Sequence, residues 1–514
     1  MRTKSFVSAC ALAIAATGGI GAVRLPALVE AVKDGDRQAI RRQLSQRTDV
    51  NAAEPDGTTA LHWAAYRNDL DTTKLLVRRG ANVKAVNRYG VTPLYLAAAN
   101  GNAAIIEELL RAGADANTPF GEGETPLMTV ARTGNVDALK VLIAHGAEVN
   151  HRENWRGETP LMWAAAAGQT AAVKFLVEVG ADLTARSTGA PAPARGGPQA
   201  QTPESRRQPQ ASAAGQGRSE APPDASKSSA ATRPRSLYTF SPLLFAVRAG
   251  HIDAVRALLD AGANPNDAVS DGTSALVLAT LNAHFELAAL LLDRGADPNA
   301  DAQGWTALHQ LEWVRRPNFG RPPPPPIPTG NLTSLDLAKA LLAHGANPNA
   351  REKREPKDNN RNDLNRIGAT PFLLAAKAAD IEMMRLLVAN GADPKLSNID
   401  DTTPLMVAAG VGIYKVGESP GTNDEALEAV KLCYELGNDV NAIDKNGDTA
   451  LHGAALRGAN QIVSFLVDNG MKHEYAAAKD NRGWTPLQIA DGIFHISVFI
   501  AHPETAALLR QLAP

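Results

Sequence analysis

Three histidines occupy the same position in a recurring turn, and their side chains are the first candidates for chemistry in this sequence. His62, His309 and His452 each follow a threonine by three residues. Histidine titrates near neutral pH and often serves as a general base, so a catalytic role is one interpretation. The alternative is that each imidazole bonds to the neighbouring threonine and to loop backbone. We expect this structural role, because all three occupy a position that the turn itself defines.

The other residues that could carry chemistry are isolated. No Gly-rich phosphate loop follows a strand, no His-Glu-x-x-His sequence occurs, and no Cys or His cluster has zinc spacing. Cys10 lies near the N-terminus, which leaves Cys433 alone on an apolar helix face, where it is expected to be a small core residue. Asp400 and Asp401 suit a solvated turn better than a metal site. We therefore expect no enzymatic activity, no metal and no cofactor.

The elements that position these residues repeat along most of the chain. The stretch from Glu124 to Asn150 shows one unit: a Thr-Pro-Leu turn, a short Ala-rich helix, a Gly turn, a second apolar helix and a closing Gly-Ala-Glu-Val-Asn. A Thr or Ser marks each turn, at steps of 32 to 34 residues where no insertion intervenes. The eleven markers are Thr59, Thr92, Thr125, Thr159, Ser241, Ser274, Thr306, Thr370, Thr403, Thr449 and Thr485. Self-similarity at a fixed period predicts a stacked array of these units.

Each part of the unit has a physical reason. Thr before Pro caps the first helix, and Pro suits the first helical turn, where a missing N–H costs nothing. Ala pairs such as Ala97-Ala98 let neighbouring helices approach closely, and Gly134 can turn the chain between helices at positive φ. A single unit cannot bury its apolar face alone, so stability must come from the interfaces between neighbours. Pro26 to Asn51 lacks the Thr-Pro-Leu turn and is predicted to be the N-terminal cap.

These features resemble the ankyrin-repeat family, whose mark is a T-P-L-H-x-A turn and helix at a period of about 33 residues. The best matches are residues 59–64, TALHWA, and residues 449–454, TALHGA. The resemblance covers about residues 26 to 514 apart from the insertions. It implies an all-α ankyrin-repeat solenoid of helix-turn-helix units with β-hairpin-like fingers, as a right-stacked array with capping repeats. It also implies a concave groove that binds other proteins.

Residues 1–22 are predicted to be a signal peptide. Arg2 and Lys4 form a short basic region, Ser5 to Val23 carries no charge, and small residues near Ala22 offer a cleavage site. The alternative is an uncleaved membrane anchor. We expect an exported bacterial protein, periplasmic or extracellular, with no membrane contact beyond this segment. The formal net charge of −2 gives no indication of nucleic-acid binding.

The rest of the chain divides into two blocks of repeats. Residues 23–186 are predicted to hold the N-terminal cap and the first repeats, and residues 237–514 the remaining repeats and the C-terminal cap. Residues 187–236 contain no large apolar residue and are expected to be a disordered Pro/Ala/Ser-rich linker. The linker is either a loop that projects from one continuous stack of repeats or a tether between two separate arrays. We favour the projecting loop. Insertions are placed at 315–331, 351–367 and 411–423.

The family resemblance places partner contacts at the finger tips and on the exposed side of the first helices. Trp, Tyr and Arg are enriched in binding hot spots, and this predicts a protein-binding set of Tyr66, Arg67, Arg88, Tyr89, Arg132, Trp155, Arg156, Trp305, Arg366 and Trp484. For Trp305 and Trp484 we favour packing on the neighbouring finger instead. Two further hypotheses remain. One is a small-molecule or catalytic site built by the insertions, with Lys415, Glu418 and Asp424. The other is self-association as a structural envelope protein.

Overall fold

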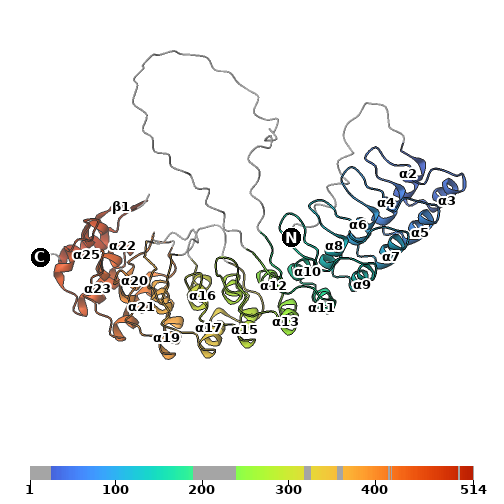
Figure 1. Ribbon diagram of the computed structural model, residues 1–514. Coiled ribbons are helices and arrows are strands. Elements are labelled where there is room, and N and C mark those ends of the chain that lie inside the picture. The colour runs from blue at the N-terminus through green and yellow to red at the C-terminus, as the bar shows by residue number, and fades with distance from the viewer. Residues whose placement is uncertain are drawn as a thin grey trace, which may run out of the picture. The chain divides into compact units, whose positions relative to one another are not determined.

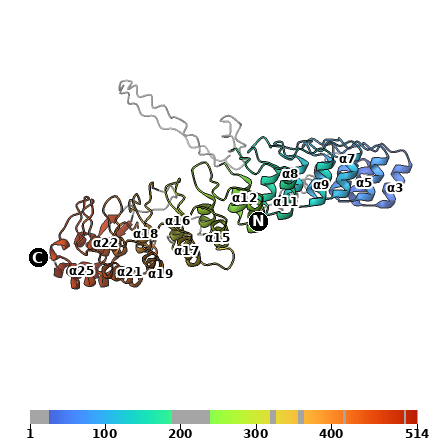
Figure 2. The same ribbon diagram turned by 60° about the horizontal axis from the view of Figure 1, so that its bottom comes forward.

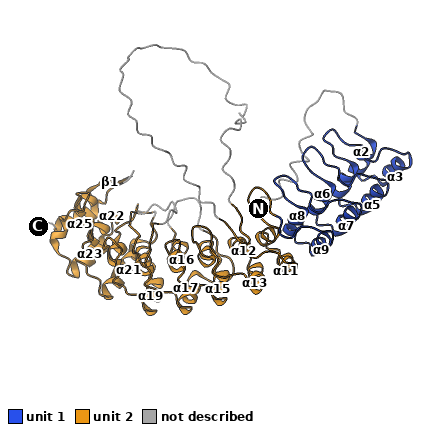
Figure 3. Cartoon of the chain, viewed as in Figure 1, with its two compact units in different colours: residues 1–151 blue, residues 152–514 orange. Residues whose placement is uncertain are grey.

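The computed structural model describes residues 25–188, 239–317, 326–355, 363–414, 417, 419–495 and 498–512. Short helices joined in pairs make up almost all of this structure (Figure 1), which confirms the predicted helical solenoid. The predicted signal peptide and nearly all of the predicted linker lie outside the described residues, as do Lys415, Glu418 and part of each insertion. The chain divides into two compact units, residues 1–151 and 152–514 (Figure 3), which are described separately.

Unit 1 contains four helix pairs. The first helices α2, α4, α6 and α8 pack side by side in one layer, and the second helices α5, α7 and α9 pack in another. The helices are α2 (Ala27–Asp34), α3 (Arg37–Ser45), α4 (Ala60–Tyr66), α5 (Leu70–Arg78), α6 (Pro93–Ala99), α7 (Ala103–Arg111), α8 (Pro126–Thr133) and α9 (Val136–Ala144). In the predicted N-terminal cap, Leu28, Val29 and Ile40 are buried while Arg37 and Arg41 are exposed.

Unit 2 has its own two-layer arrangement, which runs from α10 to α25. Each first helix packs on the next first helix and each second helix on the next second helix; Figure 2 shows several second helices from below. The elements are α10 (Pro160–Ala166), α11 (Thr170–Glu178), α12 (Pro242–Ala249), α13 (Ile252–Asp260), α14 (Ala275–Leu281), α15 (Phe285–Asp293), α16 (Ala307–Arg315), α17 (Ser334–Ala343), α18 (Pro371–Lys377), α19 (Ile381–Ala389), α20 (Pro404–Ala409), α21 (Asn423–Glu435), α22 (Ala450–Arg457), α23 (Asn460–Asp468), η1 (His473–Ala476), α24 (Pro486–Asp491), β1 (Ile493–His495), β2 (Val498–Ile500) and α25 (Pro503–Leu512).

The helices begin and end where the repeat chemistry predicts. The hydroxyl of Thr92 accepts the backbone N–H of Tyr95 at 3.1 Å, and Pro93 occupies the first helical turn. Gly134 ends α8 in the left-handed conformation, with φ of 82°. The Ala pair Ala97-Ala98 is fully buried, which allows the close approach of neighbouring first helices.

The helices on either side of residues 189–238 are direct neighbours within unit 2. Helix α12 packs on α10, and α13 packs on α11. The backbone N–H of Ser187 donates to the carbonyl of Phe240 at 2.9 Å, and the N–H of Phe240 donates to the hydroxyl of Ser187 at the same distance. The hypothesis that the linker leaves one continuous stack requires the helices on its two sides to be neighbours in this way. The division between the compact units lies one repeat earlier, at residues 151 and 152.

Asparagine side chains join successive repeats at the end of the second helices. We call them the asparagine rungs: Asn51, Asn117, Asn266, Asn299, Asn349 and Asn441. Asn349, for example, donates to the carbonyl of Gly391 at 2.9 Å and accepts the N–H of Asp393 at 2.7 Å. Both bonds reach the Gly-Ala turn of the following repeat, so each rung fixes the spacing of two units.

Candidate binding surface

The fingers are turns held by a polar side chain that lies five residues before the marker threonine. Asn87 accepts the N–H groups of Tyr89 and Val91, both at 3.0 Å. Asp444 accepts those of Asn446 and Asp448, both at 2.9 Å. These bonds fix the backbone of each tip before any partner arrives, which lowers the entropy cost of binding. The sequence analysis missed this position, although a recurring Asn or Asp at a fixed distance from the threonine was available as a signal.

Neighbouring fingers are joined through their backbones within each unit. In unit 1 the N–H of Arg88 donates to the carbonyl of Asp56 at 2.7 Å. In unit 2 the N–H of Lys445 donates to the carbonyl of Asp400 at 2.8 Å. At these positions, side chains on two successive tips lie close enough to contact one ligand.

Two fingers present an arginine stacked on an exposed aromatic ring, and we call these the tip pairs. In unit 1, the guanidinium of Arg88 lies 4.9 Å from the ring centre of Tyr89 and donates to its hydroxyl at 2.7 Å. In unit 2, the guanidinium of Arg156 lies 4.1 Å from the ring centre of Trp155. Tyr89 is 54% exposed and Trp155 46% exposed. Each tip pair offers a flat aromatic face and a cation.

The predicted contact residues at the first helices also make contacts with other residues of the repeats. Tyr66 is exposed at the end of α4, with its ring edge-on to Trp63 at 5.7 Å. Arg67 donates to the carbonyl of Lys33 at 2.8 Å, in the preceding repeat. Arg132 is exposed and lies 3.8 Å from Glu124. Arg67 therefore joins two repeats, whereas Tyr66 and Arg132 present surface to solvent.

One predicted contact residue is buried, and this corrects the sequence analysis. Arg366 is 4% exposed, forms an ion pair with Glu352, and places its guanidinium 3.5 Å from the ring centre of Trp313. The described ends of the insertion therefore pair with each other through Glu352 and Arg366, which gives the buried guanidinium the carboxylate partner that it needs. Arg366 cannot belong to an exposed contact surface.

The two tryptophans next to a marker threonine are half-buried. Trp305 donates from its ring nitrogen to Gln310 at 3.1 Å and packs near Trp313. Trp484 lies with its ring centre 5.4 Å from the guanidinium of Arg482. Both side chains pack within their own repeats.

The three histidines have the structural role that we predicted. The Nδ1 atom of His452 accepts the N–H of Thr449 at 3.1 Å, and its Nε2 atom lies 3.3 Å from the carbonyl of Trp484. His62 and His309 make the corresponding contacts. Burial lowers the pKa of each imidazole, for His309 to about 4. These rings are neutral, and both nitrogens are occupied, so they do not act as general bases.

A pocket of about 230 Å³ lies between four fingers of unit 2, the loop after α20, and helices α22 and α24. We call it the acidic pocket. Its lining includes five aspartates, one arginine and several aliphatic side chains: Asp363, Asp400, Asp444, Asp448, Asp480, Arg482, Val411, Ile413, Leu456 and Ile489. The predicted insertion at 411–423 contributes Val411, Gly412 and Ile413. Sequence analysis could not find this site, because its residues are spread over more than a hundred positions.

Asp448 is the aspartate of the acidic pocket whose pKa is clearly raised. Burial, followed by the nearby carboxylates of Asp444 and Asp480, raises the pKa of Asp448 to about 7. Asp444 and Asp480 are held in place by their own finger backbones. Among the described residues of the lining, five aspartates face one arginine, so negative charge predominates in the pocket.

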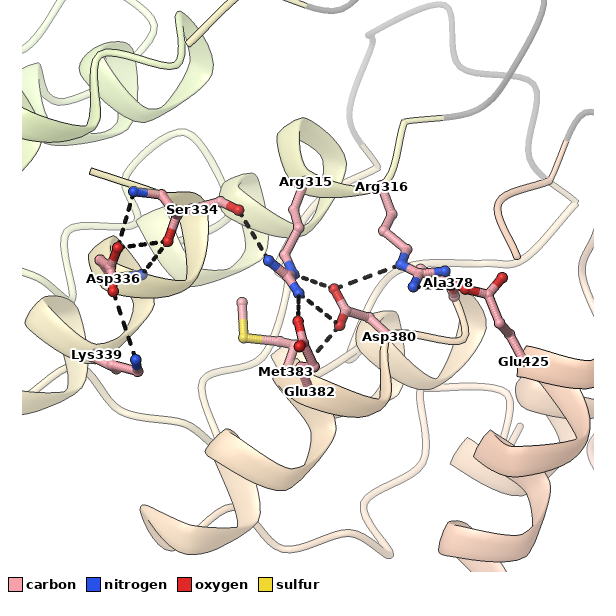
Figure 4. A network of polar contacts seen from close by, with 11 residues as sticks. Arg315, Arg316, Ser334, Asp336, Lys339, Ala378, Asp380, Glu382, Met383 and Glu425 are labelled. Atoms are coloured by element: carbon pink, nitrogen blue, oxygen red, sulfur yellow. Dashed lines mark hydrogen bonds and ion pairs between the residues drawn. The ribbon is translucent and has the colours of Figure 1, made fainter. Parts of the chain in front are cut away.

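A second ionic feature of unit 2, the charged junction, comprises Arg315, Arg316, Ser334, Asp380, Glu382 and Glu425 (Figure 4). Glu312, which the figure does not label, is its seventh member, because its pKa responds to Asp380, Arg315 and Arg316. Arg315 pairs with Asp380, donates to Glu382 at 2.6 Å, and donates to Ser334 at 3.1 Å. Arg316 donates to Glu425 at 3.0 Å. The two arginines thus join the end of α16 to α17, to α19 and to α21, so they hold successive repeats together.

Glu312 is the unsatisfied member of the charged junction. Its side chain is buried, and within the described residues neither carboxyl oxygen has a hydrogen-bond partner. Burial, followed by the charge of Asp380, raises its pKa to about 8 despite the opposing effect of Arg315 and Arg316. Glu312 is therefore protonated at neutral pH.

The remaining candidate residues do not form a catalytic or metal-binding site within the described part of the chain. Cys433 is fully buried, as predicted, and burial raises the pKa of its thiol. Among the described residues, no group of three or more His, Cys, Asp or Glu side chains is arranged to hold a metal ion. In the same part of the chain, no helix combines the length and the apolar character that crossing a bilayer requires. Asp424 is exposed in the first turn of α21.

Several known proteins are similar to parts of this chain. A putative ankyrin repeat protein of Acanthamoeba polyphaga mimivirus is 32% identical over 95 residues, which are 18% of this chain and 11% of that protein. The E3 ubiquitin-protein ligase KEG of Arabidopsis thaliana is 30% identical over 120 residues, 23% of this chain and 6% of that protein. A Caenorhabditis elegans homologue of transient receptor potential cation channel subfamily A member 1 is 33% identical over 130 residues, 25% of this chain and 9% of that protein. The chain thus matches about a tenth or less of the length of each relative.

Structural and family comparisons cover more of the chain. The crystal structure of the human ASB11 ankyrin repeat domain is similar with 24% identity and a TM-score of 0.39, over 54% of this chain and 100% of that one. A family model described as "Ankyrin repeats (3 copies)" matches residues 28–120, 100–187, 243–311 and 422–498, and one described as "Ankyrin repeat" matches residues 367–399. These family matches together cover more than half of the chain, and they coincide with the helix pairs, capped turns and fingers described above. The chain therefore belongs to the ankyrin-repeat family.

Proposed function

We propose that this protein is a non-enzymatic interaction scaffold that binds a partner protein through its finger tips and the exposed side of its first helices. Ankyrin repeats are generally modules of protein–protein interaction, and the fold is typically non-catalytic. The observation that carries the proposal is the pair of arginine–aromatic stacks, Arg88 with Tyr89 and Trp155 with Arg156. They are exposed on turns whose backbones are already fixed by side-chain hydrogen bonds.

The chemistry of the tip pairs suits a protein surface. An aromatic ring supplies a large contact area at low entropy cost, and an arginine supplies a planar cation that binds carboxylates and carbonyl groups. Each arginine is held over its ring in the free protein, so fewer rotamers are lost on binding.

The test is affinity capture with full-length protein and two variants. The tip variant carries Tyr89→Ala and Trp155→Ala. The control carries Tyr434→Ala, which removes a partly exposed aromatic side chain from α21, far from any finger tip in the repeat. Proteins captured from the organism's own extract are quantified by mass spectrometry.

We expect a partner that is retained by the wild type and the control and reduced at least tenfold by the tip variant. Equal capture by all three proteins would remove the tip pairs from the binding surface. Light scattering at several concentrations accompanies the experiment. A mass that rises with concentration, with no other protein captured, would identify self-association as the function instead.

The proposal includes export of the protein to the periplasm or the extracellular space. It rests on the basic residues Arg2 and Lys4 and the uncharged stretch from Ser5 to Val23. Expression of the full chain in a bacterium, followed by cell fractionation and mass measurement of the N-terminus, tests it. We expect a mature protein beginning near residue 23 outside the cytoplasm. A chain that keeps Met1 in the membrane fraction would indicate an anchor, and one that keeps it in the cytoplasm would exclude export.

A further inference from the structure

The acidic pocket has an excess of negative charge. Its one arginine, Arg482, lies 3.6 Å from Asp363. The other four aspartates of the lining form no ion pair with a lysine or arginine in the described part of the chain, and they are Asp400, Asp444, Asp448 and Asp480. A cation that entered the pocket would therefore meet carboxylates that have no competing positive partner.

The wall of the pocket is apolar as well as acidic. Val411 and Ile413 come from the loop after α20, Leu456 from α22 and Ile489 from α24. A pocket of about 230 Å³ can hold several waters or one long side chain, since a water molecule takes up about 30 Å³. The combination of an aliphatic wall with carboxylates matches a side chain that has an aliphatic stem and a cationic end. Lysine and arginine have this composition.

The carboxylates are positioned for a side chain and not for a metal ion. Asp444 and Asp480 each use one oxygen to accept two N–H groups of their own finger, which holds the carboxylates on separate turns. The described residues provide no cluster that could coordinate a metal. Separate carboxylates around an apolar wall can share an ammonium or guanidinium group, which has several donors.

We propose that the acidic pocket receives a lysine or arginine side chain from the partner protein. The inference rests on the proposed function, because it names the chemistry of the partner that an ankyrin scaffold would bind. The pocket lies between finger and first-helix elements of unit 2, so an extended partner segment along these fingers can place one side chain into it.

The titratable groups of the pocket predict how binding depends on pH. Asp448 shares the lining with Asp363, Asp400, Asp444, Asp480, Arg482 and the neutral His452. A bound cation favours the ionised form of Asp448, whose pKa in the free protein is about 7. Below that pH the carboxyl must first lose a proton, so the affinity for a basic side chain increases between pH 6 and pH 8.

The experiment pans a phage-displayed library of random 12-residue peptides against the full-length protein. We expect the selected peptides to be enriched in lysine and arginine. The affinity of the best peptide, measured by fluorescence polarisation, should fall about tenfold when Asp448→Asn removes one carboxylate. It should fall similarly when the central lysine of the peptide is replaced by methionine, which keeps the apolar stem.

The control variant is Asp271→Asn, which removes an exposed carboxylate from a finger outside the pocket. It should leave the peptide affinity unchanged. Asp448→Asn is expected to fold with unchanged or higher thermal stability, because it replaces a carboxyl group that is costly to ionise. A thermal melt of this variant separates a loss of binding from a loss of folding.

Three results would overturn the inference. The first is a selected set without basic residues, and the second is a basic set that Asp448→Asn binds as tightly as wild type does. The third is a Ca²⁺-dependent rise in melting temperature that Asp448→Asn abolishes, because the pocket would then hold a metal ion. If no peptide is selected while affinity capture still yields a tip-dependent partner, only the pocket inference fails. If neither succeeds, the proposed function fails with it.

Discussion

The acidic pocket and the charged junction are both ionic clusters of unit 2, but they use charge in opposite ways. In the charged junction, Arg315 and Arg316 lie among the carboxylates and link them across successive repeats. In the acidic pocket, a single arginine faces five aspartates across an open space. Each cluster contains one carboxyl with a strongly raised pKa, Glu312 in the junction and Asp448 in the pocket. The difference indicates that charge in the junction serves stability, whereas charge in the pocket remains available to a ligand.

The largest expected effect comes from breaking the charged junction. Arg315→Ala should lower the free energy of unfolding by about 3 kcal/mol, because Asp380 is left with a buried charge and without its main partner. The control is Arg294→Ala, whose partner Asp260 is 57% exposed, and it should cost less than about 1 kcal/mol. Urea denaturation followed by circular dichroism measures both. Equal effects of the two variants would mean that the junction is no more stabilising than a surface ion pair.

A smaller effect, of opposite sign, is expected at Glu312. Its pKa is raised on folding, so the folded state keeps a proton that the unfolded chain releases. Stability therefore falls as the pH rises from the unfolded pKa near 4.5 to about 8, and is constant above that. Glu312→Gln should remove this slope and make the protein more stable than wild type at pH 9. Urea denaturation at pH 5, 7 and 9 tests this expectation. Parallel pH profiles for wild type and variant would contradict a buried neutral carboxyl.

The smallest effect on stability is expected at Asp448, because its carboxyl faces an open pocket. Its raised pKa means that stability falls between about pH 4 and pH 7, and Asp448→Asn should recover less than about 1 kcal/mol at pH 8. The same denaturation series measures it. Asp448→Asn could instead increase the free energy of unfolding as much as Glu312→Gln does. The pocket carboxyl would then be as inaccessible to solvent as the junction carboxyl, and the contrast between the two clusters would disappear.

Much of the fold could be predicted from the sequence, because each part of it is determined by residues that are close together in the chain. The marker threonines, the Pro of the first turn and the Gly between helices act within a few residues of their own positions, and a fixed period then places every unit. The roles of the three histidines could be predicted for the same reason. The burial of Cys433 could be predicted from its position on an apolar helix face.

The binding features could be predicted only in part. The tip pairs involve adjacent residues, so their exposed aromatic and arginine side chains could be anticipated from a turn position. Arg366 was placed wrongly, because its burial depends on contacts with Glu352 and Trp313, which lie 14 and 53 positions earlier in the chain. The acidic pocket could not be predicted, because Asp363, Asp448 and Asp480 meet only through the stacking of four repeats and the path of an inserted loop.

The asparagine rungs have a mechanical consequence. A rung needs an amide that both donates to one turn and accepts from it, and lysine has no acceptor. Lys84 and Lys395 occupy the rung position in their repeats, and Thr184 occupies it in a third. Under tension along the stack, these joints lack the paired bonds that resist separation elsewhere. Repeats at two of these joints are linked by other bonds instead, from Asn438 to the carbonyl of Pro394 at 3.1 Å and from Arg186 to the carbonyl of Ala268 at 2.8 Å.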